Sequence, residues 1–357
     1  MVWGDLITLE YGKPVKDKAC TDGPVPVYGT NGQIGTSHLP PLCKRASMIL
    51  GRKGAYRGVH YSDVPFSVID TAFYAEPLTD RLDMKWAYYK FLTYDINRMD
   101  SGSAIPSTDR YEIYKIAVDL PPLDAQKKVV RLLDSLDAKI TCNQQINANL
   151  SDLLHTLYQS AFGHNAQKNN VGCLSDVCEL SKERVAISDL TVENYFSTEN
   201  MLPNKLGVTS ATALPAVSQV TKCKKGNTLI SNIRPYFKKI YYCQSNCGCS
   251  TDVLCFVPKT ALYSAFLFFT LYADCFFDYM VVGAKGTKMP RGDKHHIMAY
   301  PIKIPADEEL FCFNAIAEPT LAFIDKNRIE NKRLSCLRDT LLPRLMSGEL
   351  DVSGFDL

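Results

Sequence analysis

The chain has 357 residues, a formal net charge of +2 and a hydrophobic fraction of 46%. Such a length suggests two or three domains, and the composition is that of a globular protein with large cores rather than a disordered one. The near-neutral charge excludes the strongly basic character of a chain that binds nucleic acid along its whole length. Any such binding must therefore depend on local basic patches.

The most apolar stretch runs from Tyr263 to Met280 and is broken by Ser264, Asp274 and Asp278. It is shorter than the roughly 20 apolar residues that a membrane-spanning helix needs. The first residues, Met1-Val2-Trp3-Gly4-Asp5, do not resemble a signal peptide. We therefore expect no membrane association, a cytoplasmic location, and 13 cysteines that are reduced.

Residues 1–121 are predicted to form a first globular unit of the α+β class. Short runs with β propensity are separated by turns at Gly29-Thr30-Asn31-Gly32 and Gly51-Arg52-Lys53-Gly54. A helix is expected near Met84–Tyr94, and a closing strand is expected over Lys115–Leu120.

Residues 122–163 are predicted to form one long helix, because no proline follows Pro122 for about forty residues and the first glycine is Gly163. At ~1.5 Å per residue, such a helix is on the order of 60 Å long. Its apolar residues recur in alternating steps of four and three, which is typical of a coiled coil. We call the residues expected to face a partner helix the seam. In this helix they include Leu133, Leu136, Ile140, Asn143, Asn147 and Leu150.

The pattern recurs 184 positions later, without a gap, over about sixty residues. Ile140 corresponds to Ile324, and the two polar seam residues return as Asn327 and Asn331, followed by Leu334. Two half-polar seams bury little alone and much more together, so the two long helices are expected to pack on each other. The alternative is that each helix lies on its own domain.

The repeat divides the chain into a second globular unit at residues 164–305, a second long helix at 306–350 and a tail at 351–357. An interruption or kink is expected at Pro319 of the second helix. The two globular units share a skeleton, but their turn loops differ completely. A common frame with two unlike faces suggests recognition of a two-part, asymmetric target.

The sequence contains no recognisable catalytic constellation. It lacks a phosphate-binding GxxxxGK[ST] loop, a GxGxxG turn, a GxSxG elbow and the tetrapeptide of amino-methyltransferases. His295 and His296 are adjacent, so on a strand they would point to opposite faces and could not chelate together. Four cysteines lie close in sequence, but without paired CxxC spacing they indicate buried thiols, with structural zinc as the alternative. These are Cys243, Cys247, Cys249 and Cys255.

Local basic patches are interleaved with amides and aromatic residues in both globular units. Arginine can read guanine, asparagine and glutamine can read adenine, and lysine binds phosphate. A single basic loop is more often a solvated face, but such loops in two repeated units favour DNA binding. The residues predicted to contact DNA are Tyr28, Asn31, Gln33, Arg52, Lys53, Arg57, Ser103, Asn232, Arg234, Tyr236, Lys238, Lys239, Lys285, Lys288 and Arg291.

Two variable globular units, each followed by a long helix in shared register, resemble the specificity subunits of type I restriction–modification systems. The most telling residues are Leu337-Arg338-Asp339 and Leu341-Leu342-Pro343-Arg344-Leu345-Met346-Ser347-Gly348-Glu349-Leu350. Leu120-Pro121-Pro122-Leu123 with Gln126 also fits, as does Ile230-Ser231-Asn232-Ile233-Arg234-Pro235. The second long helix departs from the family, because it opens with Ala306-Asp307-Glu308-Glu309 where Pro-x-x-x-Gln is usual.

The resemblance implies that each globular unit is a target recognition domain that reads one half of a bipartite DNA site. The long helices would form an antiparallel coiled coil that fixes the spacer between the halves. Two adenine-methylating modification subunits would bind this chain, and restriction subunits would bind through them. No cofactor, metal or catalytic residue is expected in this chain. S-adenosylmethionine would belong to the modification subunits, and ATP and Mg to the restriction subunits.

Two alternatives come from other classes of protein. One is an enzyme with a cryptic site, such as a nuclease, which turnover by the purified chain would reveal. The other is a helical scaffold that holds two partner proteins without DNA. The scaffold predicts that reversing the charge of Arg234 and Lys238 leaves function intact.

Overall fold

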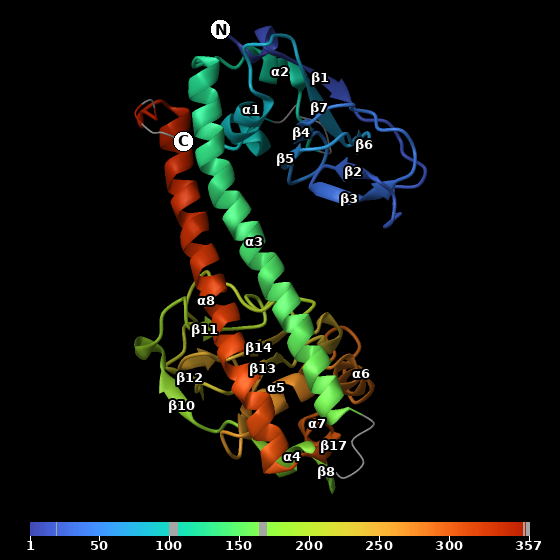
Figure 1. Cartoon of the computed structure of the whole chain (residues 1–357), viewed down its shortest axis with the longest axis vertical. Helices are drawn as coiled ribbons and strands as arrows, with labels where there is room; N and C mark the ends of the chain where they lie inside the picture. Colours follow the sequence, from blue (N-terminus) through green and yellow to red (C-terminus); the bar gives the residue numbers. More distant parts are fainter. Residues whose placement is uncertain (19, 100–105, 164–169, 353, 355–357) are drawn as a thin grey trace. The chain divides into compact units, whose positions relative to one another are not determined.

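The computed structural model describes residues 1–18, 20–99, 106–163, 170–352 and 354. The chain divides into two compact units, one of Met1–Thr141 with Asn331–Leu357 and the other of Cys142–Glu330. Each unit therefore combines one globular domain with about half of each long helix (Figure 1). Ser103, one of the residues predicted to contact DNA, lies outside the described residues.

The described residues of unit 1 form two sheets. The main sheet is antiparallel and has the order β1-β7-β4-β5. Its strands are β1 (Ile7–Tyr11), β4 (Ser47–Gly51), β5 (Val59–Ser62) and β7 (Ala72–Pro77). The smaller sheet, β3-β2-β6, consists of β2 (Val25–Gly29), β3 (Gly32–Ser37) and β6 (Ser67–Val68). The helical segments are η1 (Trp3–Asp5), α1 (Met84–Phe91), η2 (Ile96–Arg98) and α2 (Arg110–Lys115).

The core of unit 1 lies between the main sheet, α1 and the two long helices. Trp3 packs against Phe91 with ring centroids 4.6 Å apart, and both side chains are buried. The same cluster takes Val129 and Leu133 from α3 (Leu123–Phe162) and Leu345 from α8 (Asp307–Met346). Burial of apolar surface on both helices therefore anchors this domain to the ends of α3 and α8 that belong to unit 1.

Gln126 is fully buried near the start of α3. Its Oε1 accepts a hydrogen bond from Asp83 N (2.8 Å), and its Nε2 donates to Arg81 O (2.9 Å) and Pro121 O (2.8 Å). Asp83 in turn caps α1, accepting from Lys85 N and Trp86 N. The glutamine of the Pro-x-x-x-Gln motif thus joins α3, the entry to α1 and the chain that leads into α3.

Contacts of Arg338 and Lys90 hold α8 against α3 and α1 within unit 1. Arg338 Nη1 donates to Asp137 Oδ1 of α3 (2.7 Å), and Tyr89 Oη of α1 donates to Asp137 Oδ2 (2.9 Å). Lys90 Nζ donates to Met346 O, the last residue of α8 (2.7 Å). These contacts give structural roles to the arginine of the C-terminal motif and to the end of the second helix.

Unit 2 repeats the main sheet of unit 1. The order β14-β13-β16-β9 matches β5-β4-β7-β1 strand for strand. Its strands are β9 (Cys178–Leu180), β13 (Thr228–Ser231), β14 (Ile240–Tyr242) and β16 (Val253–Pro258). The second sheet, β10-β12-β15-β11, consists of β10 (Arg184–Ala186), β11 (Tyr195–Phe196), β12 (Gln219–Cys223) and β15 (Cys247–Cys249). A third pairs β8 (Asn170–Cys173) with β17 (Pro301–Ile304).

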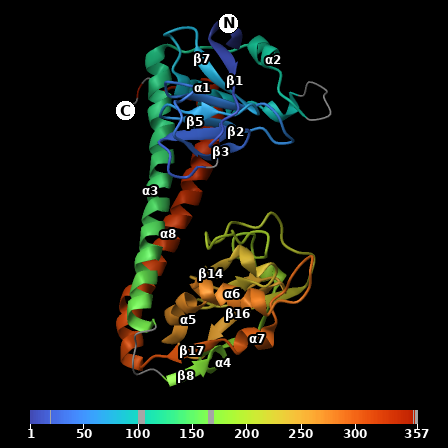
Figure 2. The same cartoon turned by 90° about the vertical axis from the view of Figure 1, so that its right-hand side faces the viewer.

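Unit 2 also contains short helices. They are α4 (Leu174–Val177), η3 (Ile187–Asp189), η4 (Pro235–Phe237), α5 (Tyr263–Tyr272), α6 (Asp274–Val282) and α7 (Lys294–Met298). Asp293 caps α7 as Asp109 caps α2, at positions that the repeat makes equivalent. Helix α5 packs in a cluster with Tyr158 and Phe162 of α3 and Phe313 of α8, with the rings of Phe162 and Phe313 5.3 Å apart. The view in Figure 2 shows α5 beside the long helices.

No single helix in the described part of the chain is long and apolar enough to cross a bilayer. Helices α5 and α6 meet such a test only as a pair, and that pair is bent by 66°.

Helices α3 and α8 run antiparallel within each unit, and asparagine side chains bond across the seam. In unit 2, Asn147 Nδ2 donates to Ile324 O (3.1 Å) and Asn327 Nδ2 donates to Asn147 Oδ1 (2.9 Å). In unit 1, Asn331 Nδ2 donates to Ile140 O (3.3 Å). The Asn331 bond is the copy of the Asn147 bond, since each residue is shifted by the 184 positions of the repeat. The antiparallel helix pair and its internal repeat are thus confirmed.

Two local predictions need correction. The segment predicted as a closing strand over Lys115–Leu120 is instead the end of α2 and a single bridge between Val2 and Ala117. Helix α8 is not interrupted at Pro319. Pro319 and Ala315, whose carbonyl loses its bond to residue 319, are both exposed, so the ring and the carbonyl face solvent.

We expect Gln126→Ala to destabilise unit 1 by about 2 kcal/mol or more, because it leaves Asp83 N and two carbonyls without a partner in the core. Urea unfolding followed by circular dichroism measures this change. Gln145→Ala is the matched control, because Gln145 is exposed on the same helix and its side chain bonds, among the described residues, the exposed side chain of Asn149. Equal stability of the two variants would contradict the role assigned to Gln126.

Candidate nucleic-acid interface

In unit 1, Thr30 joins the two turns that carry most of the predicted DNA-contacting residues. Its Oγ1 donates to Lys53 O (2.8 Å) and Thr71 O (2.8 Å), and its carbonyl accepts from Gly58 N (3.0 Å). Gly51 permits this approach, since a Cβ there would lie 2.8 Å from Thr30 O. The β2–β3 turn and the loop after β4 therefore form one continuous surface.

The predicted residues on this surface differ in exposure. Asn31, Gln33 and Lys53 are exposed, whereas Tyr28 is half-buried and packs edge-on against Phe66 at 5.7 Å between ring centroids. The amide nitrogen of Asn31, in the orientation that satisfies its neighbours, donates to Tyr56 O (2.7 Å). This surface presents amides, a cation and the exposed Tyr56 ring to solvent.

Tyr11 and Arg110 belong to this surface too, although neither was among the predicted residues. The guanidinium of Arg52 lies 4.7 Å from the centroid of the Tyr11 ring, and that of Arg110 lies 4.8 Å from it. Arg52 Nη1 also donates to Asp70 O (3.1 Å) and Arg110 Nη1 to Leu9 O (3.2 Å). Two arginines are thus fixed on one half-exposed ring, a contact between distant segments that no local sequence signal marks.

Arg57 does not lie on the exposed basic surface that the sequence predicted. Its side chain is only 2% exposed, and Nη2 donates to Ile96 O (3.3 Å) and Asn97 O (2.8 Å). Asn97 Oδ1 in turn accepts from Arg57 N (2.7 Å). Arg57 therefore holds the loop after β4 against η2, and the structure supports an internal role for it.

In unit 2, the turn that follows β13 has an unusual backbone. Arg234 and Lys238 flank η4 with φ angles of 51° and 52°, in the left-handed region that side chains with a Cβ seldom adopt. Lys238 is held there by Asp274, whose Oδ1 accepts from the Nζ atoms of both Lys238 and Lys205 at 2.8 Å. Such conformations persist only where the surroundings fix them, and they concentrate at functional sites.

The two basic segments of unit 2, far apart in sequence, lie side by side. Ile233 forms a β-bridge with Arg291, and Arg234 N donates to Pro290 O (2.8 Å). Asn232 is buried, and its Nδ2 donates to Gly292 O (3.2 Å). Most of the predicted residues of unit 2 are thereby brought together. Tyr236, Lys285, Lys288 and Arg291 are exposed.

Salt bridges restrain several of these cations. Arg291 Nη2 contacts Asp252 Oδ1 (3.0 Å), and Lys285 pairs with Asp293. Asp293 accepts from Lys285 and from the amides of α7, which lowers its pKa to about 2. Lys239 Nζ donates to Thr198 O (2.6 Å), so this lysine is partly internal. Arg234 differs from these residues, since its Nε is buried without a hydrogen-bond partner among the described residues.

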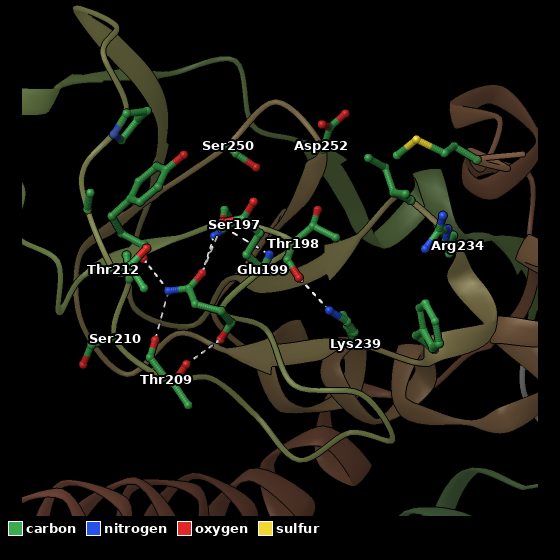
Figure 3. A pocket seen from close by; sticks show the side chains of 18 residues that line it. Ser197, Thr198, Glu199, Thr209, Ser210, Thr212, Arg234, Lys239, Ser250 and Asp252 are labelled. Atoms are coloured by element: carbon green, nitrogen blue, oxygen red, sulfur yellow. Dashed lines mark hydrogen bonds between the residues drawn. The ribbon is translucent and has the colours of Figure 1, made fainter. Parts of the chain in front are cut away.

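Arg234 lines a cavity of about 790 Å³ that lies within unit 2 (Figure 3). The other residues labelled in Figure 3 line the cavity with hydroxyls, two carboxylates and the amine of Lys239. Its apolar lining includes Ile233, Phe237 and Met289. The polar side chains are Ser197, Thr198, Glu199, Thr209, Ser210, Thr212, Ser250 and Asp252. The segment 195–215 supplies most of this wall and was not predicted. A cluster of hydroxyl residues, Thr209-Ser210-Ala211-Thr212, is the signal that could have marked it.

Asn200 builds the wall of this cavity. It is buried, its Oδ1 accepts from Ser197 N (2.6 Å), and its Nδ2 donates to Tyr195 O (2.9 Å) and Thr209 O (2.9 Å). One side chain therefore fixes both strands of the loop. Rigid hydroxyls, carboxylates and a guanidinium around a space of this size form donor and acceptor pairs of the kind that read base edges.

The buried cysteines of unit 2 do not form a ready metal site. Cys243 Sγ lies 3.6 Å from Cys247 Sγ, and burial raises the pKa of the Cys243 thiol. Together with Cys249 and Cys255 they lie in an apolar core cluster. Among the described residues, the metal-ligand type atoms that approach within 4.8 Å of one another are those of Cys20, Asp22 and His38 in unit 1.

The adjacent histidines also differ from expectation, because they lie on helix α7 rather than on a strand. His296 stacks on Tyr279 with ring centroids 3.9 Å apart, and its Nε2 contacts Tyr279 O (3.1 Å). Packing against α6 therefore accounts for this residue.

Comparisons with known proteins agree with this architecture. Residues 4–152 match the family model described as type I restriction modification DNA specificity domain. The chain is 20% identical to the type I restriction enzyme EcoDI specificity subunit of Escherichia coli, over 97% of this chain and 87% of that subunit. The crystal structure of a type I restriction–modification S subunit from M. genitalium has a similar fold. Its TM-score is 0.65 at 14% identity, over 97% of this chain and 95% of that one.

We expect acid to weaken the Lys205–Asp274–Lys238 contact between pH 4 and 2. The two lysines lower the pKa of Asp274 from 3.8 to about 2, so the folded state is stabilised above pH 3.8 and loses that contribution as the pH falls to about 2. The stability difference between the wild type and Asp274→Asn should therefore shrink over this range, as measured by urea unfolding at each pH. A difference that is constant with pH would show that the contact does not contribute.

Proposed function

The chain is related to the specificity subunits of type I restriction–modification systems, and we propose that each of its units reads one half of a bipartite, asymmetric DNA site. Both units present cations and aromatic side chains on loops of the repeated domain, and unit 1 also presents the exposed amides of Asn31 and Gln33. The loops that carry them differ between the units, so the two half-sites would differ in sequence. Phosphate contacts from lysines would position the duplex, and side chains on the loops would read bases.

The cavity of unit 2, with Arg234 on its wall, is the observation that carries this proposal. The guanidinium of Arg234 would bind acceptors of a nucleic acid in the cavity through charge-assisted hydrogen bonds. The left-handed backbone at Arg234 and the hydrogen bond from Arg234 N to Pro290 O fix the position of its Cα and the direction of its side chain. Glu199 and Asp252 offer acceptors for the amino groups of cytosine or adenine nearby.

In unit 1, the surface joined by Thr30 would serve the other half-site. Asn31 and Gln33 carry the amides suited to adenine, Lys53 suits phosphate, and Arg52 and Arg110 are positioned by Tyr11. The partial exposure of Tyr11 leaves part of that ring open to a base or sugar. This arrangement differs from the cavity of unit 2, in keeping with an asymmetric target.

The helix pair would set the number of unread base pairs between the halves. A 40-residue helix is ~60 Å long, and half-sites one turn of DNA apart are separated by ~34 Å. Because the seam asparagines fix the register of α3 against α8, the spacing would be constant rather than adjustable.

The chemistry would lie in other chains. Two modification subunits would bind the helix pair, use S-adenosylmethionine and methylate an adenine flipped out of the duplex. Restriction subunits that use ATP and Mg would join through them. This chain would supply DNA recognition in the cytoplasm and would not itself catalyse a reaction.

We expect Arg234→Ala to weaken binding of the cognate DNA by roughly 10- to 100-fold and to relax base preference in one half-site only. Binding of the assembled methyltransferase to duplexes that vary in one half-site measures both effects. Arg184→Ala is the matched control, because Arg184 is an exposed arginine of unit 2 that does not line the cavity. If the variant keeps its base preference in both half-sites, Arg234 does not read bases.

Methylome sequencing of cells with and without this chain, beside its modification partner, tests the function itself. We expect a split motif with methyl-adenine in both halves only when the chain is present. Replacing residues 1–121 by another recognition domain should change one half and leave the other unchanged. If no methylation depends on the chain, DNA specificity is excluded and the scaffold alternative gains support.

A further inference from the structure

The part of helix α8 that lies in unit 2 exposes an apolar face. Phe311 is 62% exposed, Ile316 49%, Phe323 46% and Ile329 48%. The steps between exposed residues are short and repeat at helical spacing, so they form one broad face. The exposed residues between Phe311 and Ile329 are Phe311, Cys312, Ala315, Ile316, Glu318, Pro319, Ala322, Phe323, Lys326 and Ile329. Only Glu318 and Lys326 in this set are charged. We call this set the α8 face.

The other long helix has no such face in unit 2. The exposed residues of α3 there are mostly hydroxyls, amides and small side chains, with Leu153 as the large apolar exception. Large apolar side chains gathered on one solvent-facing helix surface, where a neighbouring helix carries polar ones, mark a surface that binds another protein.

The repeat places an equivalent face on α3 in unit 1, and there the chemistry is different. Four residues 184 positions before the α8 face are basic, whereas Leu132 in the place of Ile316 is apolar and Gln145 in the place of Ile329 is a neutral amide. Lys127, Lys128, Arg131 and Lys139 stand in the places of Phe311, Cys312, Ala315 and Phe323. Lys127, Arg131 and Lys139 are exposed, as are Ser135 and Ala138 beside them. We call this set the α3 face.

The difference is confined to the outward side of the helices. On the inward side, Val129 corresponds to Phe313 and Ile140 to Ile324, and these positions are apolar in both copies. Val129 and Phe313 are both buried in the core of their own unit. Core packing therefore does not explain why one outward face is basic and the other apolar.

We propose that the two modification subunits are held by unlike contacts. One binds the α8 face mainly by apolar burial, and the other binds the α3 face mainly by charge. This inference rests on the proposed function, since it takes the modification subunit as the partner of both faces. The repeated helix pair offers two equivalent places to one kind of partner. One partner surface fits both faces if an apolar centre is bordered by acidic side chains.

The two contacts respond differently to salt. Burial of apolar area is not weakened by ionic screening. Exposed charge pairs weaken as the Debye length falls to ~3 Å at 1 M salt. Raised ionic strength therefore releases the subunit on the α3 face first, and a complex with one modification subunit accumulates.

Native mass spectrometry of the complete methyltransferase, after equilibration at increasing ammonium acetate concentration, tests the stoichiometry. We expect two modification subunits at low salt and one at high salt. Alkylation of Cys312, which is exposed on the α8 face of the free chain, identifies the site that stays occupied. Cys312 should react in the free chain and remain protected in the complex with one modification subunit. Loss of both subunits together, or reaction of Cys312 when the first leaves, would overturn the proposal.

Charge variants give a second, independent test. Phe311→Lys with Phe323→Lys gives the α8 face the residues of the α3 face, and should make both subunits leave at the same, lower salt concentration. The matched control, Asn149→Lys with Thr156→Lys, adds the same charge to the exposed polar side of α3 in unit 2 and should leave assembly unchanged. Circular dichroism checks that each variant is folded. Equal effects of the two pairs would contradict a specific α8 face.

The outcomes separate this inference from the function on which it rests. If no modification subunit binds at any salt concentration, the proposed function fails as well. If two bind and leave together, only the inference of unlike contacts fails. If the free chain forms dimers with Cys312 protected, a second copy of this chain occupies the α8 face and the inference is wrong.

Discussion

The antiparallel pairing of α3 and α8 is the constraint on which the rest of the structure depends. Neither globular domain completes its core alone, because each one buries apolar residues from both helices. The seam that joins the helices is partly polar, and its asparagines bond to backbone carbonyls and to each other. Such bonds cost stability compared with an apolar seam, but they permit one register and disfavour the others. Any sliding of the helices would therefore disturb both cores.

The long helices and the repeat could be predicted because their signals are local or periodic. A heptad pattern without internal proline or glycine locates α3, and the fixed 184-residue offset locates its copy. The short strands followed from turn residues and β propensity, apart from the segment after α2. At that place the helix cap of Asp109 decides the local structure, and a six-residue helix leaves only a bridge at Ala117.

The candidate site was predicted less completely, for physical reasons. Sequence marks a residue as basic or amide-bearing but does not say whether its side chain reaches solvent. Arg57 is buried against η2, whereas Arg110, 53 positions later in a different segment, completes the exposed cluster on Tyr11. The wall of the unit 2 cavity depends on Asn200 and on contacts between distant loops. Long-range packing of this kind leaves no periodic signal in the chain.

The two units also differ in the number of chain segments that form them. Unit 2 is one continuous segment, Cys142–Glu330, whereas unit 1 needs Asn331–Leu357 as well as the first 141 residues. Leu342, Leu345 and Met346 are buried in the unit 1 core, and Lys90 bonds the carbonyl of Met346. At about 5–20 residues per second, the ribosome takes on the order of ten seconds or more to pass from Thr141 to Asn331. During synthesis, the N-terminal domain therefore leaves part of its apolar core exposed until residues 331–357 have been made. The second domain in the sequence can complete its core before the first.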